Sequence, residues 1–196
     1  ALAAVLRRFP QREPEAMQRA AFRDGSGSLM LPSGWRIVDA FEGAVNAIGP
    51  DGAGVDLGAH RIVLDPRVTP VITPGMLAGA YCHPAESLRI LYPALTAMNA
   101  QLGDPTQLRL LNVIEYVDTQ SPSPQVGGQW ALVYYEWERN GQPYQSIGLI
   151  GTVPMAVNWG HYWSSVSAPK EVFASKLPTL MRIWQSYYVS EQSVAK

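Results

Sequence analysis

Apolar and polar residues alternate over several short stretches of the chain, which is the period of half-buried β-strands. The Asn140-Gly141 pair lies between two of these stretches, and Asn-Gly is a strong hairpin signal because both residues tolerate positive φ. The run 49–52, Gly-Pro-Asp-Gly, gives a second turn. We expect a meander of antiparallel strands. Within 29–38, a short strand from Leu29, a Pro/Gly turn and a second strand from Trp35 are expected, and further strands follow at 45–48, 54–57, 61–64, 108–117, 130–138, 144–153 and 157–166.

Two other stretches have the period of amphipathic helices. From Pro84 onward, apolar residues recur at gaps of three and four, and Pro93 within this stretch predicts a kink. Its expected apolar stripe is Leu88, Leu91, Leu95, Met98 and Leu102. A second helix follows Pro169, with a stripe of Phe173, Leu177, Leu180, Trp184 and Tyr187, and a short helical piece is expected at 76–81. The predicted class is α+β: an antiparallel sheet with helices packed on its faces.

The first 28 residues read as an N-terminal arm with a flexible joint. Pro10 and Pro14 interrupt this stretch, and 15–23 could form a short helix after Pro14. The run 25–28, Gly-Ser-Gly-Ser, is typical of a joint. We therefore expect an arm at 1–28, able to bind its own domain or a neighbouring chain, and a single α+β domain at 29–196.

Composition narrows the function classes. A chain of 196 residues with 47% apolar content can bury a full core. The formal net charge of −1 leaves no basic excess for nucleic acid. Charged residues make up only 16% of the chain, against about 25% in typical domains. This fits either an extracytoplasmic protein or a surface that partner proteins partly cover.

Three sequence features bear on the cellular location of the protein. Cys82 is the lone cysteine, so an intrachain disulfide cannot form. No run of about 18 apolar residues predicts a transmembrane segment. The sequence begins at Ala1 without Met, so we expect either an exported protein with its signal peptide removed or a missing upstream segment. The expected location is periplasmic or extracellular, with membrane association possible through partners.

Three groups of residues are candidates for catalysis or metal binding. Cys82 and His83 precede Pro84, where a helix N-terminus could lower a thiol pKa, but adjacent residues rarely face each other. Glu136 and Glu138 share one face of an expected strand, about 7 Å apart by strand rise, but near a hairpin tip they also fit a solvated surface. A long-range metal site could join His60, His161 and Glu115. We expect no catalytic residue, no metal site and no cofactor.

An aromatic row is the most distinctive candidate for binding. Trp159, His161 and Trp163 alternate, so they share one face of an expected strand. If exposed, this face would suit stacking on a ring or sugar, or an interface hot spot. Alternatively, the terminal helix covers it, with Trp184 and Tyr187 packed against the row.

The order of these signals resembles the PsbP-like superfamily over about 29–190. The resemblance is carried by Leu-Pro-Ser-Gly-Trp at 31–35, by the hairpin at 49–52, and by the run 163–169 that leads into the terminal helix. It implies an α/β/α sandwich, and a mostly non-catalytic fold used for docking onto larger assemblies. Some photosystem members bind metal, but their ligands have no match in this sequence.

The sequence therefore predicts a non-catalytic, extracytoplasmic accessory subunit that docks into a larger protein complex, through its N-terminal arm or the 159–163 strand. A small-ligand binding module using the aromatic row is an alternative, and a hydrolase or metalloenzyme with a long-range site is another. No nucleic-acid partner is expected.

Overall fold

The computed structural model describes residues 7, 9, 13–69, 72–73 and 76–190. The chain forms two compact units. Residues 60–163 make the first unit, and the described residues of 2–59 and 164–196 make the second. Strands β5 (Gly54–Leu64) and β9 (Asn158–Pro169) each run from one unit into the other.

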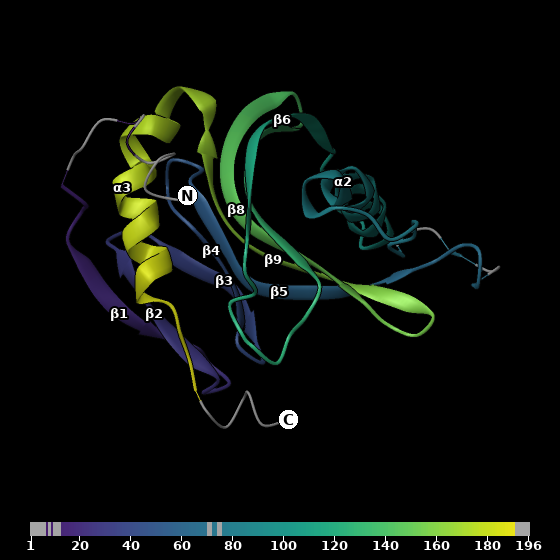
Figure 1. Ribbon diagram of the computed structural model, residues 1–196. Helices are drawn as coiled ribbons and strands as arrows, with labels where there is room; N and C mark the ends of the chain where they lie inside the picture. Colours follow the sequence, from purple (N-terminus) through teal and green to yellow (C-terminus); the bar gives the residue numbers. More distant parts are fainter. Residues whose placement is uncertain (1–6, 8, 10–12, 70–71, 74–75, 191–196) are drawn as a thin grey trace. The chain divides into compact units, whose positions relative to one another are not determined.

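The second unit contains a three-stranded sheet with the order β1-β2-β10, formed by β1 (Met17–Ala21), β2 (Gly27–Pro32) and β10 (Tyr188–Val189). Helix α3 (Lys170–Ser186) packs against β2, as Figure 1 shows. Its apolar stripe faces inward, since Phe173, Leu177 and Leu180 are all buried. Ser186 Oγ accepts a hydrogen bond of 2.8 Å from the Met30 amide, which fixes the end of the helix on β2.

The same unit contains the antiparallel run β3 (Arg36–Phe41), β4 (Ala44–Ile48) and β5. The expected turn at 49–52 joins β4 to β5, and Gly52 has the positive φ of 80° that favours glycine there. Lys176 of α3 forms ion pairs with Asp51 in this turn and with Glu15 ahead of β1. The stretch before β1 is thereby bound to its own unit.

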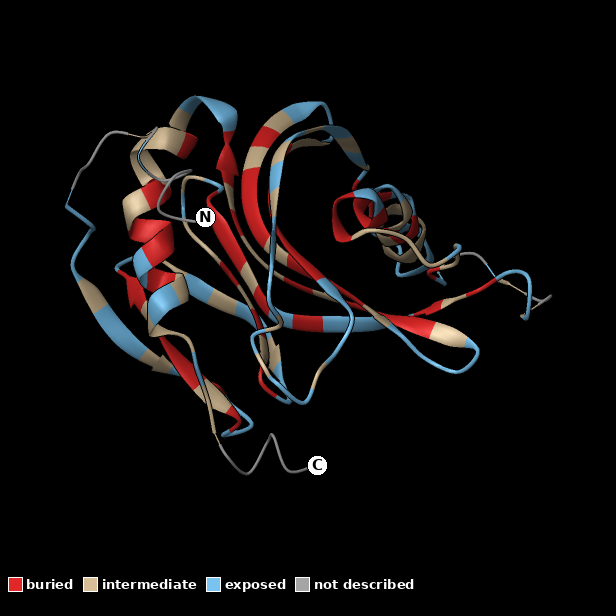
Figure 2. Ribbon diagram, viewed as in Figure 1, coloured by how far each residue is buried: buried red, intermediate tan, exposed pale blue. Residues whose placement is uncertain are grey.

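The first unit is dominated by long strands in the order β9-β8-β7-β6. They comprise β6 (Leu108–Thr119), β7 (Gln129–Arg139), β8 (Gln142–Pro154) and the first half of β9. The Asn140-Gly141 hairpin is confirmed, because β7 pairs with β8 from Arg139 and Gln142 outward and both turn residues have positive φ. Buried residues concentrate on β7 and β8, whereas β6 has none (Figure 2).

Helix α2 (Pro84–Gln101) completes the first unit and confirms the helix expected from Pro84. His83 is its N-cap, with Nδ1 accepting a hydrogen bond from the Ala85 amide. Leu88 and Leu91 are buried as expected, but the last residue of the expected stripe, Leu102, is 83% exposed because the helix has ended there.

Three expectations are wrong. The stretch 15–23 contains strand β1 where a helix was expected, because 17–21 pairs with 28–32 of β2. The run 25–28 is the turn of this hairpin and the start of β2, with Ser26 and Ser28 buried, so it is no flexible joint. The stretch 76–81 has no helical turn; instead Ala78 forms a parallel bridge with Leu64. The expected boundary at residue 28 therefore falls inside one sheet of the second unit.

The class is α+β, with α3 and α2 packed against antiparallel strands, as the sequence predicts. None of the described helices is long and apolar enough to cross a membrane.

Candidate functional site

The aromatic row on β9 lies in the first unit and is buried. The exposed fractions are 1% for Trp159, 1% for His161 and 7% for Trp163. Their rings follow one another, with centroids 6.2 Å and 5.4 Å apart. The three side chains are thus neighbours, as their alternation predicts, but the row is not an exposed stacking surface. A small-ligand binding module that uses this row would need an exposed aromatic face, and the row does not provide one.

The segment that leads into α2 holds this row. Trp159 Nε1 donates a hydrogen bond of 2.9 Å to the Gly79 carbonyl, and the Tyr81 ring packs edge-on against the Trp159 indole. Ser87 of α2 lies 2.9 Å from His161. These contacts come from 79–87. They are not the contacts with Trp184 and Tyr187 of the terminal helix that the sequence suggested as an alternative.

His161 is held as a neutral core residue. Ser87 Oγ donates its hydrogen to the Pro84 carbonyl, at 2.6 Å, so it accepts from His161 Nε2–H. Nδ1 is then left as an acceptor, and it has no partner among the described residues. Burial lowers the pKa of His161 from 6.5 to about 4. An enclosed, neutral imidazole suits packing, because no substrate could reach it.

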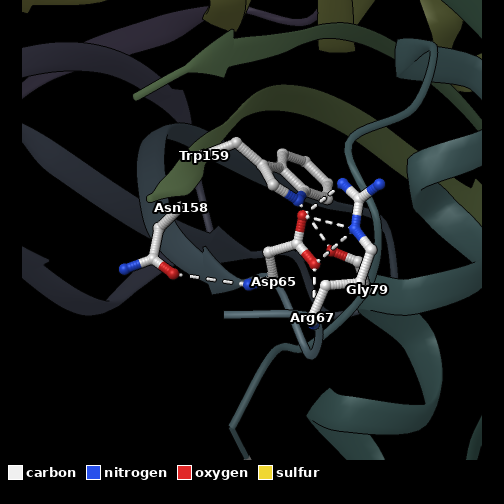
Figure 3. Close-up of polar contacts among 5 residues, drawn as sticks. All are labelled: Asp65, Arg67, Gly79, Asn158 and Trp159. Atoms are coloured by element: carbon white, nitrogen blue, oxygen red, sulfur yellow. Dashed lines mark hydrogen bonds and ion pairs between the residues drawn. The ribbon is translucent and has the colours of Figure 1, made fainter. Parts of the chain in front are cut away.

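A turn at the end of β5 lies beside the first residue of the row (Figure 3). The Asp65 carboxylate accepts hydrogen bonds from the Arg67 amide and guanidinium, which lower the pKa of Asp65 to about 2. The Asp65 amide donates to Asn158 Oδ1, which ties this turn to the start of β9. These polar groups satisfy one another, so we assign the cluster to structure.

Cys82 and His83 do not form a nucleophile–base pair. His83 Nδ1 accepts from the Ala85 amide, so Nε2–H faces Asp118 Oδ1 at 2.8 Å and both ring nitrogens are engaged. Burial raises the pKa of the Cys82 thiol, and the charge of Glu86 raises it further. This is the reverse of what an activated cysteine needs.

The acidic and histidine candidates are also dispersed. Glu138 is paired with Arg109, and Glu136 accepts from Gln145, each at 2.8 Å. His60 stacks on Tyr162. In the part of the chain that the structure describes, no three histidine, cysteine or acidic side chains gather as metal ligands would. The long-range metal site of His60, His161 and Glu115, an alternative that the sequence left open, is therefore not formed.

A groove of about 730 Å³ runs between α2 and β6 in the first unit. It is lined by 107–113 on the strand side and by Arg89, Pro93 and Thr96 on the helix side. Thr96 Oγ1 exchanges hydrogen bonds with the Leu108 backbone at one end of β6, and His83 contacts Asp118 at the other. The His83 ring also lies against the Tyr116 ring, with centroids 4.8 Å apart. The groove follows 107–113, at the Thr96 end of the strand.

Exposed apolar side chains gather on the same strand. Leu111 is 40%, Ile114 41% and Tyr116 51% exposed. The strand was predicted, but with Leu111, Val113 and Val117 on one face. Register shifts at 110–112 and 113–115 interrupt that alternation and turn Leu111 and Ile114 out of regular pairing. The sequence signal for this surface was the stretch 110–114, in which four of five residues are apolar and Asn112 is the exception, more apolar residues than a strand with a solvated face normally carries.

Comparison with known proteins finds similarity in structure alone. No protein-family model matches the sequence, and a search of curated proteins finds no match. Among solved structures, the chain is similar to a cyanobacterial PsbP (CyanoP) from Synechocystis sp. PCC 6803, with 13% identity, a TM-score of 0.41 and coverage of 92% of this chain and 96% of that one. It is also similar to LpqN, involved in cell envelope biogenesis of Mycobacterium tuberculosis (12% identity, TM-score 0.36, 88% and 87% covered).

A third similar structure is the Ran-binding protein Mog1p of Saccharomyces cerevisiae, with 9% identity, a TM-score of 0.35 and coverage of 92% of this chain and 98% of that one. The functional proposals below stand on the contacts and exposure of this chain's own residues.

Proposed function

We propose that this protein is a non-catalytic accessory subunit that docks onto another protein through β6 and the adjoining groove. The observation that carries the proposal is the exposed apolar set Leu111, Ile114 and Tyr116 on one strand. Large apolar side chains that stay in contact with water on a sheet strand are typical of surfaces that a partner covers.

The non-catalytic part of the proposal is supported by how the polar groups are used. His161 is enclosed, His83 caps a helix, and the Cys82 thiol has a raised pKa. Catalytic groups need reach to a substrate and a pKa near the working pH. His161 lacks reach to a substrate, both ring nitrogens of His83 are engaged, and the raised pKa of Cys82 disfavours the thiolate.

The docking surface belongs on β6 and not on the expected N-terminal arm. The described residues 13–21 are bound within the second unit: the Glu15 amide donates to Thr179 Oγ1 of α3, and Glu15 pairs with Lys176. Part of the expected arm, 1–6, 8 and 10–12, lies outside the described residues.

We further propose an extracytoplasmic location, which the low charged fraction of 16% supports. Fractionation of producing cells, with detection of a C-terminal epitope tag, tests it. Recovery with the cytoplasmic fraction would contradict this location without touching the docking proposal.

Size-exclusion chromatography with light scattering tests docking. The tagged full chain in native extract of producing cells should elute in an assembly heavier than the 21.5 kDa chain. Leu111→Asp should release the monomer, because it places a charge in the interface. Phe41→Asp is the matched control: Phe41 is exposed on another edge strand, and its replacement should leave the assembly intact. A wild-type chain that elutes strictly as a monomer would refute the proposal.

A further inference from the structure

Among the described residues, the outer side of β6 faces α2 and pairs with no second strand. The strand order of these residues ends at β6, which pairs with β7. The Leu108 amide donates to Thr96 Oγ1 at 2.8 Å, and its carbonyl accepts from the same hydroxyl at 2.9 Å. Helix α2 thus already uses the outward groups at the first residue of the strand. Further along the strand, the His83 ring lies 4.8 Å from the Tyr116 ring, and His83 Nε2 lies 2.8 Å from Asp118 Oδ1.

The groove follows this backbone edge. Its strand side is lined by seven consecutive residues, 107–113, and by Glu138 of β7. A regular strand seen from one face would contribute alternate residues only, since successive side chains point to opposite faces. The consecutive lining brings the groove against the backbone of β6 as well as against the Arg109–Glu138 pair, and the backbone of an edge strand carries hydrogen-bond donors and acceptors.

The opposite edge strand is a poorer candidate for the same role. Strand β3, which pairs with β4 alone, has six residues, and the cavity beside it is about 270 Å³. Strand β6 has twelve residues and a cavity of about 730 Å³. An added strand of about five residues needs a length of roughly 17 Å, which β6 supplies with room to spare.

The charge of the groove indicates the kind of segment that fits. Arg109 is paired with Glu138, whereas Arg89 makes no hydrogen bond or ion pair with any described residue. One positive charge on the α2 side is thus uncompensated. An acidic side chain on an incoming segment would meet it.

A second copy of this chain fits less well. Two copies paired edge to edge would bring the uncompensated Arg89 residues toward each other. The observations favour a different polypeptide.

We propose that the groove between α2 and β6 takes an extended, acidic segment of a partner protein, which adds a strand to the open edge of β6. This inference rests on the proposed docking function and names its mode: backbone hydrogen bonds supply affinity, and Arg89 selects an acidic side chain.

Random peptides of about ten residues, displayed on phage and selected against the full chain, test the mode. Selected peptides should be enriched in Asp and Glu and should slow hydrogen exchange of backbone amides within 109–117. Arg89→Glu should weaken their binding about tenfold, since like charges would meet. Arg36→Glu, at an exposed arginine of the other edge strand, should not change it.

Peptides N-methylated at alternate amides keep their side chains but cannot complete the ladder, so one of the two alternating sets should fail to bind. The inference is overturned if no peptide is enriched, if both N-methylated sets bind unchanged, or if Arg36→Glu weakens binding as much as Arg89→Glu. If one of these results is found and Leu111→Asp still loses the assembly, the docking function stands, and the partner docks through a folded surface and not through an added strand. If the peptides bind as expected but the chain is strictly monomeric in extract, the strand-addition mode stands and the proposed docking function fails.

Discussion

Ser87 Oγ lies 2.9 Å from His161 Nε2, and this hydrogen bond joins helix α2 to the centre of strand β9 across 74 residues of sequence. It places a polar contact beneath the helix that forms one wall of the β6 groove.

Acidification should loosen this part of the first unit. The folded pKa of His161, about 4, lies below its ordinary value of 6.5, so the unfolded chain binds the proton first as the pH falls. The stability is fully present above about pH 6.5 and is lost toward pH 4, with about 2 kcal/mol gone between pH 7 and pH 5. Urea unfolding at a series of pH values measures this.

His161→Phe provides the comparison. The variant removes the titrating group, so its free energy of unfolding should change less between pH 7 and pH 5, whatever its absolute stability. Identical slopes for the variant and the wild type would show that another group carries the dependence.

Ser87→Ala should cost about 1–3 kcal/mol of unfolding free energy, because it leaves the buried Nε2–H of His161 without an acceptor. Ser175→Ala is the matched control: its hydroxyl also donates to a carbonyl three residues back, that of Val172, and it lies on the partly exposed side of α3. That change should stay within about 0.5 kcal/mol. Equal losses in chemical denaturation would contradict the assigned role of Ser87.

Thr152→Val should raise the unfolding free energy by up to about 1 kcal/mol. The Thr152 hydroxyl is buried without a partner among the described residues, and valine replaces it at nearly the same volume. Thr179→Val removes a buried hydroxyl that accepts from the Glu15 amide, so the same change there should lower stability. Thermal unfolding of both variants shows whether each change raises or lowers stability. A lower stability of Thr152→Val would show that the Thr152 hydroxyl has a hydrogen-bond partner.

Local chemistry explains what the sequence could predict. The Asn140-Gly141 turn needs positive φ at two positions, and the residues that allow it are adjacent. Strand β1 was missed because Met17-Gln18-Arg19-Ala20-Ala21 is made of good helix formers. Pairing with β2 overrides that preference, and no local pattern reports a partner strand.

In the candidate site too, local sequence predicts some features, and long-range contacts decide the others. The period of two placed Trp159, His161 and Trp163 side by side, but their burial depends on Gly79, Tyr81 and Ser87, which lie far away in sequence. The sequence did not predict the proposed docking surface, because the interruption of β6 pairing at Leu111 and Ile114 depends on β7, its partner strand. Both failures come from long-range contacts.

Site-specific photo-crosslinking tests the docking surface most directly. A benzophenone amino acid replaces Leu111 of the full chain in producing cells, and Phe41 in the control; both native side chains are exposed on edge strands. Irradiation should yield one discrete heavier adduct from position 111 and none from position 41, with mass spectrometry placing the partner's crosslinked residue in an extended acidic segment. Equal yields from both positions, or no adduct from position 111, would contradict the assignment of β6 as the docking strand.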